Sequence, residues 1–522
     1  MTVRARALRA LDTALAQLGH DPALAGVRTA VGVLRDDFAR TMRVALVGRV
    51  SSGKSTLANA LLEGDFAPTG ILELTYNVTW LRHAPDPAVT VHFRDGRAPE
   101  PRDLADLAAL AARTRTGHES PAYLAAISHL DVSHPNPRLR GYDLIDTPGL
   151  DALGGDPQAA KTLALLGRSA AEVTRETAAV AARADAIVLV FPRAVSTTDA
   201  AVAADFLQGG SGGPVDPVAV VGALTKIEHH WPDHDPLTQG ARDAARLMRW
   251  PQLRRTAYEI LPVAGRLAAA AARFTEQDHA GLAELAAHPD QRGLAARAEN
   301  AQLFAAADNG LPLPADVRAG LWERFTGWGL VTACGLIRED PGTSAERLRG
   351  ELAERSGLTG LRQLLESHFA ARADAIKLHR TVTRAQGLAD GPAARLSPRQ
   401  RDTARRVLAG ITRLTHDHAL RELGVLRALA LGELQLDAIR TTELARLCGR
   451  FGDTAAARLG AAADAGPSEL VRLAGEGHAR WSAAVLDPWH RAADLAACRT
   501  ALAVYDGLLH DLTGTAERSP CP

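Results

Sequence analysis

The chain has 522 residues, more than one hydrophobic core usually organises, so we expect two or more structural units. Its 60 basic and 60 acidic residues give a formal net charge of zero, which argues against a surface built to bind nucleic acid. The first twenty residues lack the apolar core of a secretory signal, and the four cysteines show no zinc-binding spacing. No run is long and apolar enough to span a membrane. These features predict a cytoplasmic protein whose membrane contact, if any, is peripheral.

Two amphipathic helices are predicted in residues 1–41. Apolar residues recur at spacings of three and four from Leu8 to Leu18 and again from Val27 to Phe38. A break at 19–22, which contains a glycine and a proline, separates them. The C-terminal segment 495–512 has the same period. We therefore expect the two ends of the chain to pack together in one bundle.

The sequence pattern changes at residue 42, from helical periodicity to short β-rich runs, and residues 42–270 predict an α/β domain. Short β-rich runs alternate with helical or polar stretches in this region. The runs are 44–47, 76–83, 89–93, 142–146, 186–191, 218–225 and 258–263. This pattern predicts a mostly parallel sheet with helices on both faces and some antiparallel edge strands.

A glycine-rich loop follows the first of these strands. Only four of the 60 basic residues are lysines, and one of them, Lys54, stands in the sequence GRVSSGKST, which satisfies the P-loop pattern. Gly48 and Gly53 let the backbone curl, so that its amides, including those of Ser52 and Thr56, face phosphate oxygens. Lys54 reaches the β- and γ-phosphates, and the hydroxyl of Ser55 ligates Mg²⁺. The loop therefore predicts a nucleoside triphosphate site.

The sequence DTPG, residues 146–149, supplies a second phosphate-side element. Asp146 ends a predicted strand, where its carboxylate can hold Mg²⁺ through water, and the amide of Gly149 can sense a γ-phosphate. Between the two motifs, a threonine hydroxyl should complete the metal shell in the triphosphate state. We choose Thr75 for this role, with Thr69 as the second candidate.

Base selection is predicted at Thr225, Lys226 and Glu228, which close the strand 218–225. The pattern in GTPases is [NT]KxD, in which the lysine stem lies along the purine and the aspartate accepts two N–H bonds from guanine. Glu228 stands at the aspartate position. Because a glutamate has an extra methylene, the sequence supports guanine selectivity less strongly than it supports the phosphate site. An ATPase remains the alternative.

Residues 271–522 predict helices almost throughout, with breaks at 309–314, 341–343, 387–398 and 466–468. Two apolar stretches in this region, 328–337 and 423–436, are too short to span a bilayer. Each is interpreted either as a buried bundle helix or as a tip that inserts shallowly into lipid.

The motif order GRVSSGKST, PTGILELT, DTPG and TKIE resembles the GTPase domain of bacterial dynamin-like proteins. The helical region through LPLPADVRAGLWERFTGWGL to DPWHRAADLAACRTALAVYDGLL is similar to that of the actinobacterial, isoniazid-inducible Ini-type members. The resemblance implies a Mg²⁺-dependent GTPase with a helical bundle and stalk. It also implies a homo-oligomer or nucleotide-dependent dimer, a lipid surface as partner and a paired dynamin-like homologue as a further one.

Two positions depart from relatives that position the attacking water with glutamine. This chain has Val50 in the P-loop and Leu150 after DTPG, and neither side chain can orient water. Ser51 matches a dynamin P-loop serine, and Arg49 is a hypothetical source of charge stabilisation in cis or across a dimer. We expect slow hydrolysis that self-association accelerates. The alternative function is a GTP-dependent switch that binds a protein or ribosomal partner without deforming lipid.

Overall fold

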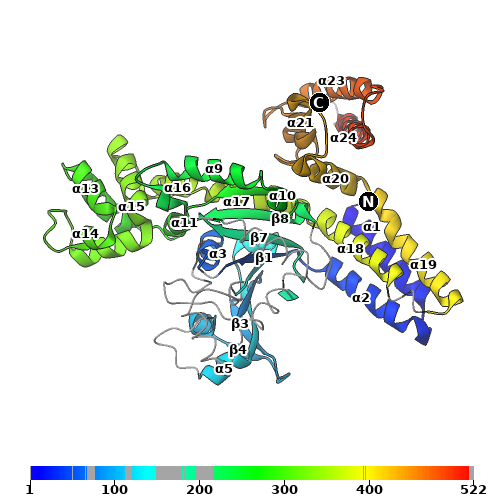
Figure 1. The fold of residues 1–522 in the computed structure, drawn as a ribbon, viewed down its shortest axis with the longest axis horizontal. Helices are drawn as coiled ribbons and strands as arrows, with labels where there is room; N and C mark the ends of the chain where they lie inside the picture. The colour runs from blue at the N-terminus through cyan, green and yellow to red at the C-terminus, as the bar shows by residue number, and fades with distance from the viewer. Residues whose placement is uncertain are drawn as a thin grey trace, which may run out of the picture. The chain divides into compact units, whose positions relative to one another are not determined.

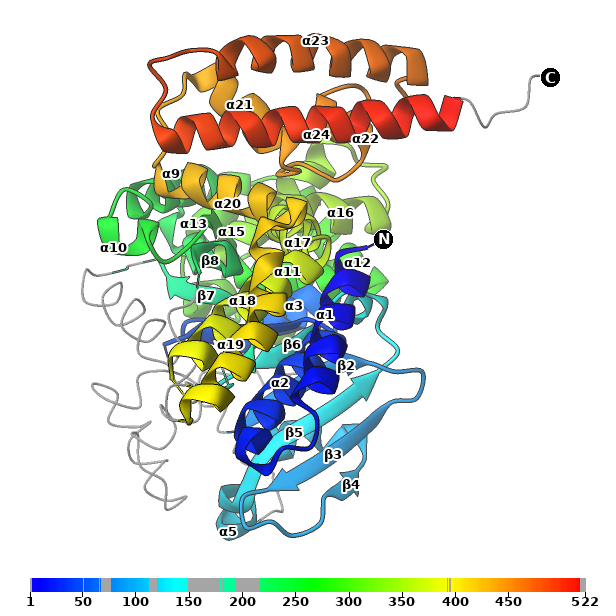
Figure 2. The same cartoon turned by 90° about the vertical axis from the view of Figure 1, so that its right-hand side faces the viewer.

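The computed structural model describes residues 2–49, 51–64, 66, 77–111, 120–148, 179–180, 183–193, 195, 216–391, 393 and 396–516 (Figures 1 and 2). It divides into two compact units. One, the helical unit, comprises Met1–Met42, Pro217–Ala219 and Leu365–Pro522. The other, the sheet unit, comprises Arg43–Asp216 and Val220–Leu364. The chain therefore passes between the units at several points, one of which is the Leu364–Leu365 bond.

Within the described residues, the sheet unit contains one nine-stranded sheet in the order β4-β3-β5-β2-β6-β1-β7-β8-β9. The strands are β1 (Arg43–Gly48), β2 (Val78–His83), β3 (Ala88–Phe93), β4 (Glu100–Arg102), β5 (Ile127–His134), β6 (Asp143–Asp146), β7 (Ala186–Pro192), β8 (Val220–Thr225) and β9 (Glu259–Pro262). Strands β6, β1, β7, β8 and β9 run parallel to one another. Pairing turns antiparallel between β2 and β6, and β3 is antiparallel to both β4 and β5. The predicted mostly parallel sheet with antiparallel strands toward one edge is confirmed.

Burial explains why these runs form strands. All six residues of β8 are buried, and β1 is buried from its second residue onward, as expected for parallel strands covered on both faces. Strand β3 instead alternates, with Val89 and Val91 buried and their neighbours more exposed, as expected for a strand with one solvated face.

Helices of the sheet unit flank the strands and continue beyond β9. They are α3 (Lys54–Leu62), α4 (Leu107–Ala111), α5 (Pro121–Ala126), α9 (Pro236–Leu247), α10 (Pro251–Arg254), α11 (Gly265–Ala272), α12 (Glu276–Ala287), α13 (Gln291–Ala298), α14 (Ala301–Ala305), α15 (Ala315–Glu339), α16 (Ala345–Arg355) and α17 (Leu358–Leu364). Short turns η3 (Pro137–Arg140) and η6 (Ile227–His230) complete this unit near the site.

The domain boundary predicted at residue 270 differs from the structure. Helices α12 to α17 group with the sheet unit, which extends to Leu364. The physical reason is a shared core, because Leu267 of α11, Phe325 of α15 and Leu352 of α16 belong to the same buried cluster as Ile145 of β6. A change from β-rich to helical sequence marks secondary structure, but it does not mark where a hydrophobic core ends.

The helical unit begins with α1 (Val3–Leu18) and α2 (Ala25–Ala39), which pack with α18 (Ala373–Asp390) and α19 (Pro398–Thr412) (Figure 1). Leu11, Leu18 and Phe38 are buried on the faces that the 3- and 4-residue spacing predicted. An ion pair of 2.7 Å between Arg6 and Asp417 also joins the N-terminal helix to the later part of the chain.

The rest of the helical unit consists of α20 (His418–Leu431), α21 (Ala438–Leu447), α22 (Ala455–Leu459), α23 (Pro467–Val485) and α24 (Ala492–Ala516). Helices α23 and α24 pack as a hairpin (Figure 2). Gly477 allows this contact, because a Cβ there would lie 2.2 Å from the ring of Tyr505. The Tyr505 hydroxyl donates a 2.6 Å hydrogen bond to Glu443 of α21, which ties the hairpin to its neighbour.

Of the two apolar stretches considered for lipid contact, 328–337 is mostly buried, whereas 423–436 is buried only at Leu423, Val425 and Leu426. In α15, Leu330, Ala333 and Cys334 lie in the core of the sheet unit, so 328–337 is a core helix and not a membrane tip. In α20, Leu423 and Leu426 are buried, and Gly432, in the left-handed region with φ of 65°, ends the helix. Among the described residues, no helix is both long and apolar enough to cross a bilayer.

Candidate nucleotide site

The P-loop connects β1 to α3 through a tight turn. A Cβ on Gly48 would lie 2.3 Å from the carbonyl oxygen of Val190 in β7, so only glycine fits this position. Gly53 has φ of 93°, which also favours glycine, and its backbone begins α3. Ser51 has φ of 57° and is exposed, whereas Ser52 is buried. The glycines therefore stand where the loop geometry requires them, as the pattern predicted.

Lys54 and Ser55 occupy the first turn of α3 and point toward the end of the sheet. The Lys54 ammonium is buried and donates hydrogen bonds to the carbonyl oxygens of Gly48, at 3.1 Å, and Arg49, at 2.9 Å. The Ser55 hydroxyl donates a 2.9 Å bond to Oδ2 of Asp146, the last residue of β6. The structure thus brings the predicted lysine, serine and aspartate of two separate motifs together.

Asp146 has the chemistry of a magnesium-side carboxylate. It is fully buried, and its Oδ1 has no hydrogen-bond partner among the described residues. Burial raises the pKa of Asp146 from 3.8 to about 6, while the Lys54 charge and the Ser55 hydrogen bond oppose that rise. A hydroxyl beside a carboxylate with a spare oxygen fits Mg²⁺, which prefers such oxygen ligands.

Threonines at the ends of two strands hold the loop in place. The Thr225 hydroxyl donates to the carbonyl oxygen of Ser52 in the P-loop and lies 2.9 Å from that of Phe191 in β7. The Thr147 hydroxyl donates a 2.6 Å bond to the carbonyl oxygen of Leu46 in β1. The Thr225 hydroxyl therefore positions the loop, and the predicted contact of Thr225 with nucleotide stays a prediction. The Thr147 bond was not predicted, because nothing in DTPG indicates which strand the hydroxyl reaches.

Lys226 and Glu228 lie directly after β8. Lys226 adopts φ of 60°, which turns the chain into η6, and Glu228 is buried in that turn. Oε2 of Glu228 has no hydrogen-bond partner among the described residues. Burial raises the pKa of Glu228, and the charges of Arg266 and Lys226 oppose that rise. A buried carboxylate oxygen without a donor is what recognition of two base N–H groups requires.

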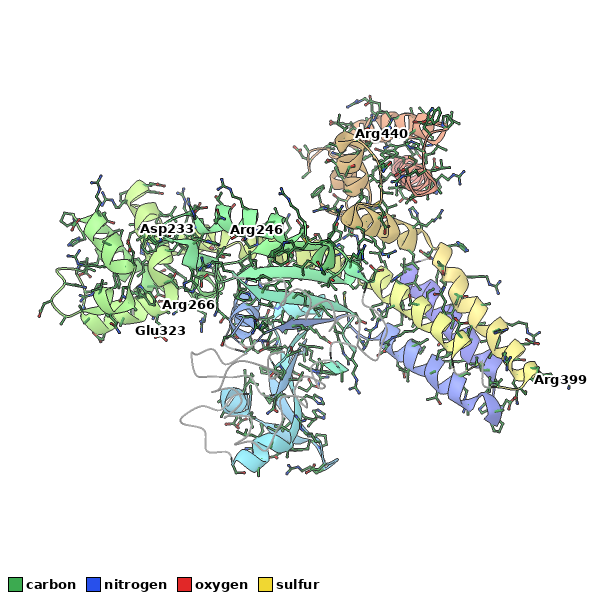
Figure 3. All side chains as sticks on the ribbon, viewed as in Figure 1. Asp233, Arg246, Arg266, Glu323, Arg399 and Arg440 are labelled. Atoms are coloured by element: carbon green, nitrogen blue, oxygen red, sulfur yellow. The ribbon has the colours of Figure 1, made fainter. Side chains whose placement is uncertain are left out.

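Arg266 is a neighbour of this acid that the sequence did not indicate. It follows β9 at the start of α11, and its guanidinium also donates to the carbonyl oxygen of Glu323 in α15 (Figure 3). Its position shortly after the predicted strand 258–263 was the only available signal.

Several predicted site residues stay predictions. Thr69, Thr75 and Gly149 are outside the described residues. Arg49 and Thr56 flank the loop as expected, but their predicted roles toward phosphate are not tested by the geometry. Among the described residues, no group of three or more histidine, cysteine or acidic side chains is arranged to hold a metal ion.

A mostly parallel sheet with a P-loop between β1 and α3, and an acid at the end of β6, defines a P-loop nucleoside triphosphatase. The model of the dynamin family matches residues 44–209. The isoniazid-induced protein IniC of Mycobacterium tuberculosis is 31% identical over 479 residues, which cover 90% of each chain. Dynamin-like protein 2 of Campylobacter jejuni is 33% identical over 117 residues, covering 22% of this chain and 18% of that protein. A solved structure of an oligomerised bacterial dynamin pair covers 98% of this chain and 91% of its own, with 11% identity and a TM-score of 0.34.

The chain belongs to the dynamin family of GTPases, in its bacterial, IniC-like branch. Membership implies GTP binding and hydrolysis.

Proposed function

We propose that this protein is a Mg²⁺-dependent GTPase that couples nucleotide-dependent self-association to the binding and remodelling of a membrane surface. It would act in the cytoplasm, peripherally associated with the inner face of the plasma membrane. The phosphate side of the proposal is supported by Lys54, Ser55 and Asp146, which converge at one end of the sheet. Bound Mg²⁺ would neutralise phosphate charge there.

The chain's own residues account for binding more readily than for fast hydrolysis. Lys54 supplies a fixed positive charge, and the loop amides supply donors for phosphate oxygens. Val50 and Leu150 carry no polar group to orient water. We therefore expect a second copy of the chain, or a paired homologue, to accelerate turnover, with Arg49 as the candidate for added charge stabilisation.

Base selection is proposed to favour guanine. Glu228 offers a buried carboxylate oxygen, and Lys226 and Arg266 favour its charged form. A charged carboxylate accepts hydrogen bonds only, and guanine presents two N–H donors on the relevant edge whereas adenine does not. The glutamate therefore suits guanine on chemical grounds despite its extra methylene.

The observation that carries the membrane half is a group of exposed apolar side chains on the helical unit. Ile439 is 80% exposed, Leu486 is 81% exposed and Trp489 is 88% exposed, the highest values among the large hydrophobic side chains described. Ile439 lies in the first turn of α21, and the other two lie in the connection between α23 and α24. We call these three residues the apolar tip.

Two hydrogen bonds place the segments of the apolar tip at one end of the α23–α24 hairpin. Arg491 donates a 2.8 Å bond to the carbonyl oxygen of Glu433, and the backbone N–H of Gln435 donates a 2.7 Å bond to Asp494. These bonds join the α20–α21 linker to the α23–α24 connection and to the first turn of α24, and Figure 2 shows these segments at that end of the hairpin. Figure 3 labels Arg440, which follows Ile439.

The chemistry of the apolar tip suits the interface of a bilayer. Tryptophan with aliphatic neighbours is typical of side chains that partition into the headgroup region. The nearby charges are paired, Arg440 with Asp437 at 3.6 Å and Arg491 with Asp494 at 3.1 Å. Lipid binding should therefore depend mainly on apolar insertion and only weakly on salt.

One experiment tests both halves. Purified protein is sedimented with vesicles of zwitterionic phospholipid, without nucleotide, with GTP and with a non-hydrolysable GTP analogue, and phosphate release is measured in parallel. Pelleting that the analogue increases, together with vesicle-stimulated hydrolysis, is the expected result. GTP hydrolysis without pelleting at any salt concentration would refute membrane coupling and would favour a protein partner.

A further inference from the structure

The C-terminal end of the P-loop helix is held by side chains from two distant segments. The last four carbonyl groups of a helix have no partner within the helix and must find one elsewhere. In α3 these belong to residues 59–62. The backbone N–H of Gly64 donates a 3.1 Å bond to the carbonyl oxygen of Asn59. The side-chain amide of Asn136, beside η3, donates a 2.6 Å bond to the carbonyl oxygen of Leu62.

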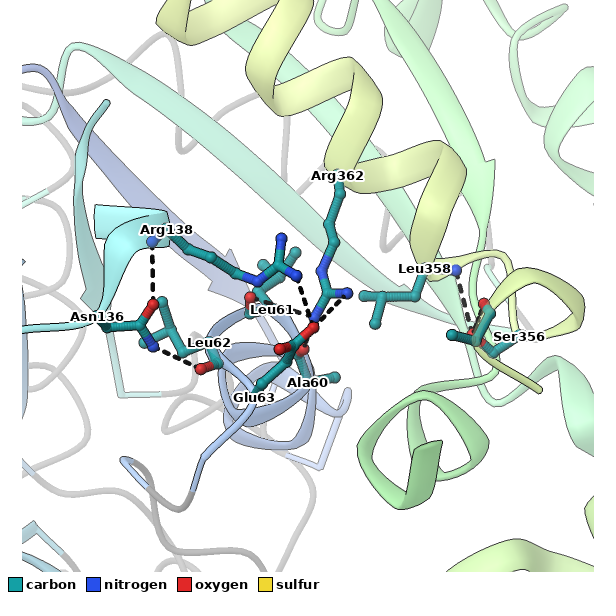
Figure 4. Close-up of polar contacts among 10 residues, drawn as sticks. Ala60, Leu61, Leu62, Glu63, Asn136, Arg138, Ser356, Leu358 and Arg362 are labelled. Carbon is teal, nitrogen blue, oxygen red and sulfur yellow. Dashed lines mark hydrogen bonds and ion pairs between the residues drawn. The ribbon is translucent and has the colours of Figure 1, made fainter. Parts of the chain in front are cut away.

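Arg362 of α17 satisfies the remaining two. Its Nη2 donates to the carbonyl oxygens of Ala60 and Leu61, and its Nη1 lies 2.9 Å from Oε1 of Glu63 (Figure 4). Glu63, with φ of 54°, ends the helix and also accepts a 2.6 Å bond from Arg138 of η3. We call Glu63, Arg138 and Arg362 the clasp.

The clasp connects elements that contribute to the nucleotide site at their other ends. Helix α3 begins with Lys54 and Ser55, and η3 leads into β6, which ends at Asp146. A helix of nine residues is about 14 Å long and rigid, so a displacement at its phosphate end reaches the clasp with little loss.

The segment just before Arg362 also touches the base side of the site. The backbone N–H of Ala264 donates a 2.8 Å bond to the carbonyl oxygen of Ser356. Gly357 has φ of 78°, and a Cβ on it would lie 2.3 Å from the carbonyl oxygen of Pro262 at the end of β9. Residues 356–362 therefore contact both the end of β9, which pairs with the base-recognition strand β8, and the far end of the P-loop helix.

Two residues beyond Arg362, the chain leaves the sheet unit. Leu364 is the last residue of that unit, and Leu365 begins η7 (Leu365–Ala370) of the helical unit. We propose that the clasp transmits the state of the nucleotide site into the helical unit through α17, with Arg362 as the positioning residue. This inference rests on the proposed function, because it supplies the coupling between GTP and the lipid-binding part of the chain.

The alternative is that Arg362 caps a helix and does nothing more. A cap alone would affect the stability of the sheet unit, but it would leave the response of the helical unit to nucleotide unchanged. The test must therefore measure that response separately from nucleotide binding.

Hydrogen–deuterium exchange of the full chain, with and without the GTP analogue and Mg²⁺, makes this separation. In the wild-type protein we expect protection of residues 48–56 and a changed exchange in residues 365–390. In Arg362→Ala we expect the protection of 48–56 to persist and the change in 365–390 to fall at least threefold. Arg347→Ala is the matched control, because Arg347 of α16 forms an exposed ion pair with Asp340 in the same unit. It should behave as the wild type.

Two milder variants keep the test usable if Arg362→Ala fails to fold. Arg362→Lys keeps the charge near Glu63 but loses the planar fork that reaches two carbonyl groups. Glu63→Gln removes the ion pairs with Arg138 and Arg362 but leaves the carbonyl groups of Ala60 and Leu61 available to Arg362. Both should weaken the response of 365–390. An undiminished response in a folded variant overturns the proposal, as does a wild type that protects 48–56 with no change beyond 364. Absence of protection at 48–56 in the wild type would refute the nucleotide site and the coupling with it.

Discussion

Replacing Asp146 with asparagine should stabilise the empty protein and abolish its response to Mg²⁺ and nucleotide. The carboxylate is fully buried, and burial raises its pKa from 3.8 to about 6. Each pKa unit corresponds to about 1.4 kcal/mol, so ionised Asp146 lowers the free energy of unfolding by about 3 kcal/mol near neutral pH. The folded pKa is raised, so this cost is absent below pH 3.8 and complete above pH 6.

The amide of Asp146→Asn removes the charge but introduces an N–H₂ group that needs an acceptor. An unsatisfied buried donor costs about 1 kcal/mol or more, which leaves a net gain of about 1–2 kcal/mol. The asparagine oxygen can still accept the hydroxyl of Ser55. We therefore expect a higher unfolding midpoint for the variant in magnesium-free, nucleotide-free buffer at pH 7.5.

With Mg²⁺ and the GTP analogue present, the wild type should instead have the higher unfolding midpoint. The wild type gains stability from the bound complex, whereas the variant has lost a carboxylate ligand and should gain little. Differential scanning calorimetry and analogue titration measure both effects, with Asp143→Asn, at the other end of β6, as control. An empty variant less stable than the wild type would show that the buried charge of Asp146 does not limit the stability of the empty protein. An unchanged gain with analogue would remove Asp146 from the metal site.

Three further outcomes are expected. Glu228→Gln should reduce the preference for GTP over ATP at least tenfold in nucleotide competition, because the neutral amide replaces one acceptor with a donor; an unchanged preference would place base selection elsewhere. Replacing Leu486 and Trp489 together with serine should lower vesicle partitioning by about 100-fold, since about 3 kcal/mol of apolar transfer is lost, whereas Val33→Ser, another exposed site on the helical unit, should have little effect. Burial lowers the pKa of His368 from 6.5 to about 3. The contribution of the neutral imidazole to the free energy of unfolding is therefore complete above pH 6.5, and it falls by up to about 5 kcal/mol as the pH drops toward 3. His368→Gln should flatten that part of the pH–stability curve measured by urea unfolding, and an unchanged slope would contradict the assignment.

Local patterns identified the parts of the fold that depend on local chemistry. The P-loop glycines were predictable because a tight turn and a close backbone approach exclude other residues, as Gly48 against Val190 illustrates. Helix breaks were predictable because glycine and proline interrupt helices, and α19 and α23 each begin at a proline. Strand β5 was missed, because a register shift opposite His92 and Phe93 breaks its alternation, so that Ile127, Leu130 and Val132 are buried at unequal spacing.

Contacts between distant segments were not predictable from the same patterns. Thr225 is predicted to bind nucleotide because it fits a base-recognition motif, but the motif does not indicate that its hydroxyl also meets the backbone carbonyl groups of Ser52 and Phe191. Arg362 and Glu63 carry no motif at all, and only the fold brings them together across about 300 positions of sequence. A single sequence shows which residues have useful chemistry, but it does not show which partner each of them meets.

The candidate residues for lipid contact illustrate the same limit. Continuous apolar sequence led to the stretch 328–337, but such runs are what a buried helix needs, and this one lies in the core. The apolar tip instead consists of single residues beside polar ones, as in LDPWHR, where an average over neighbouring residues is unremarkable. Leu486 and Trp489 are exposed because α23 ends at Val485 and the chain then turns toward α24. A hydropathy pattern does not show where such a turn lies. For a protein that touches a membrane only peripherally, isolated apolar residues at helix connections are therefore better candidates for contact than its most apolar segments.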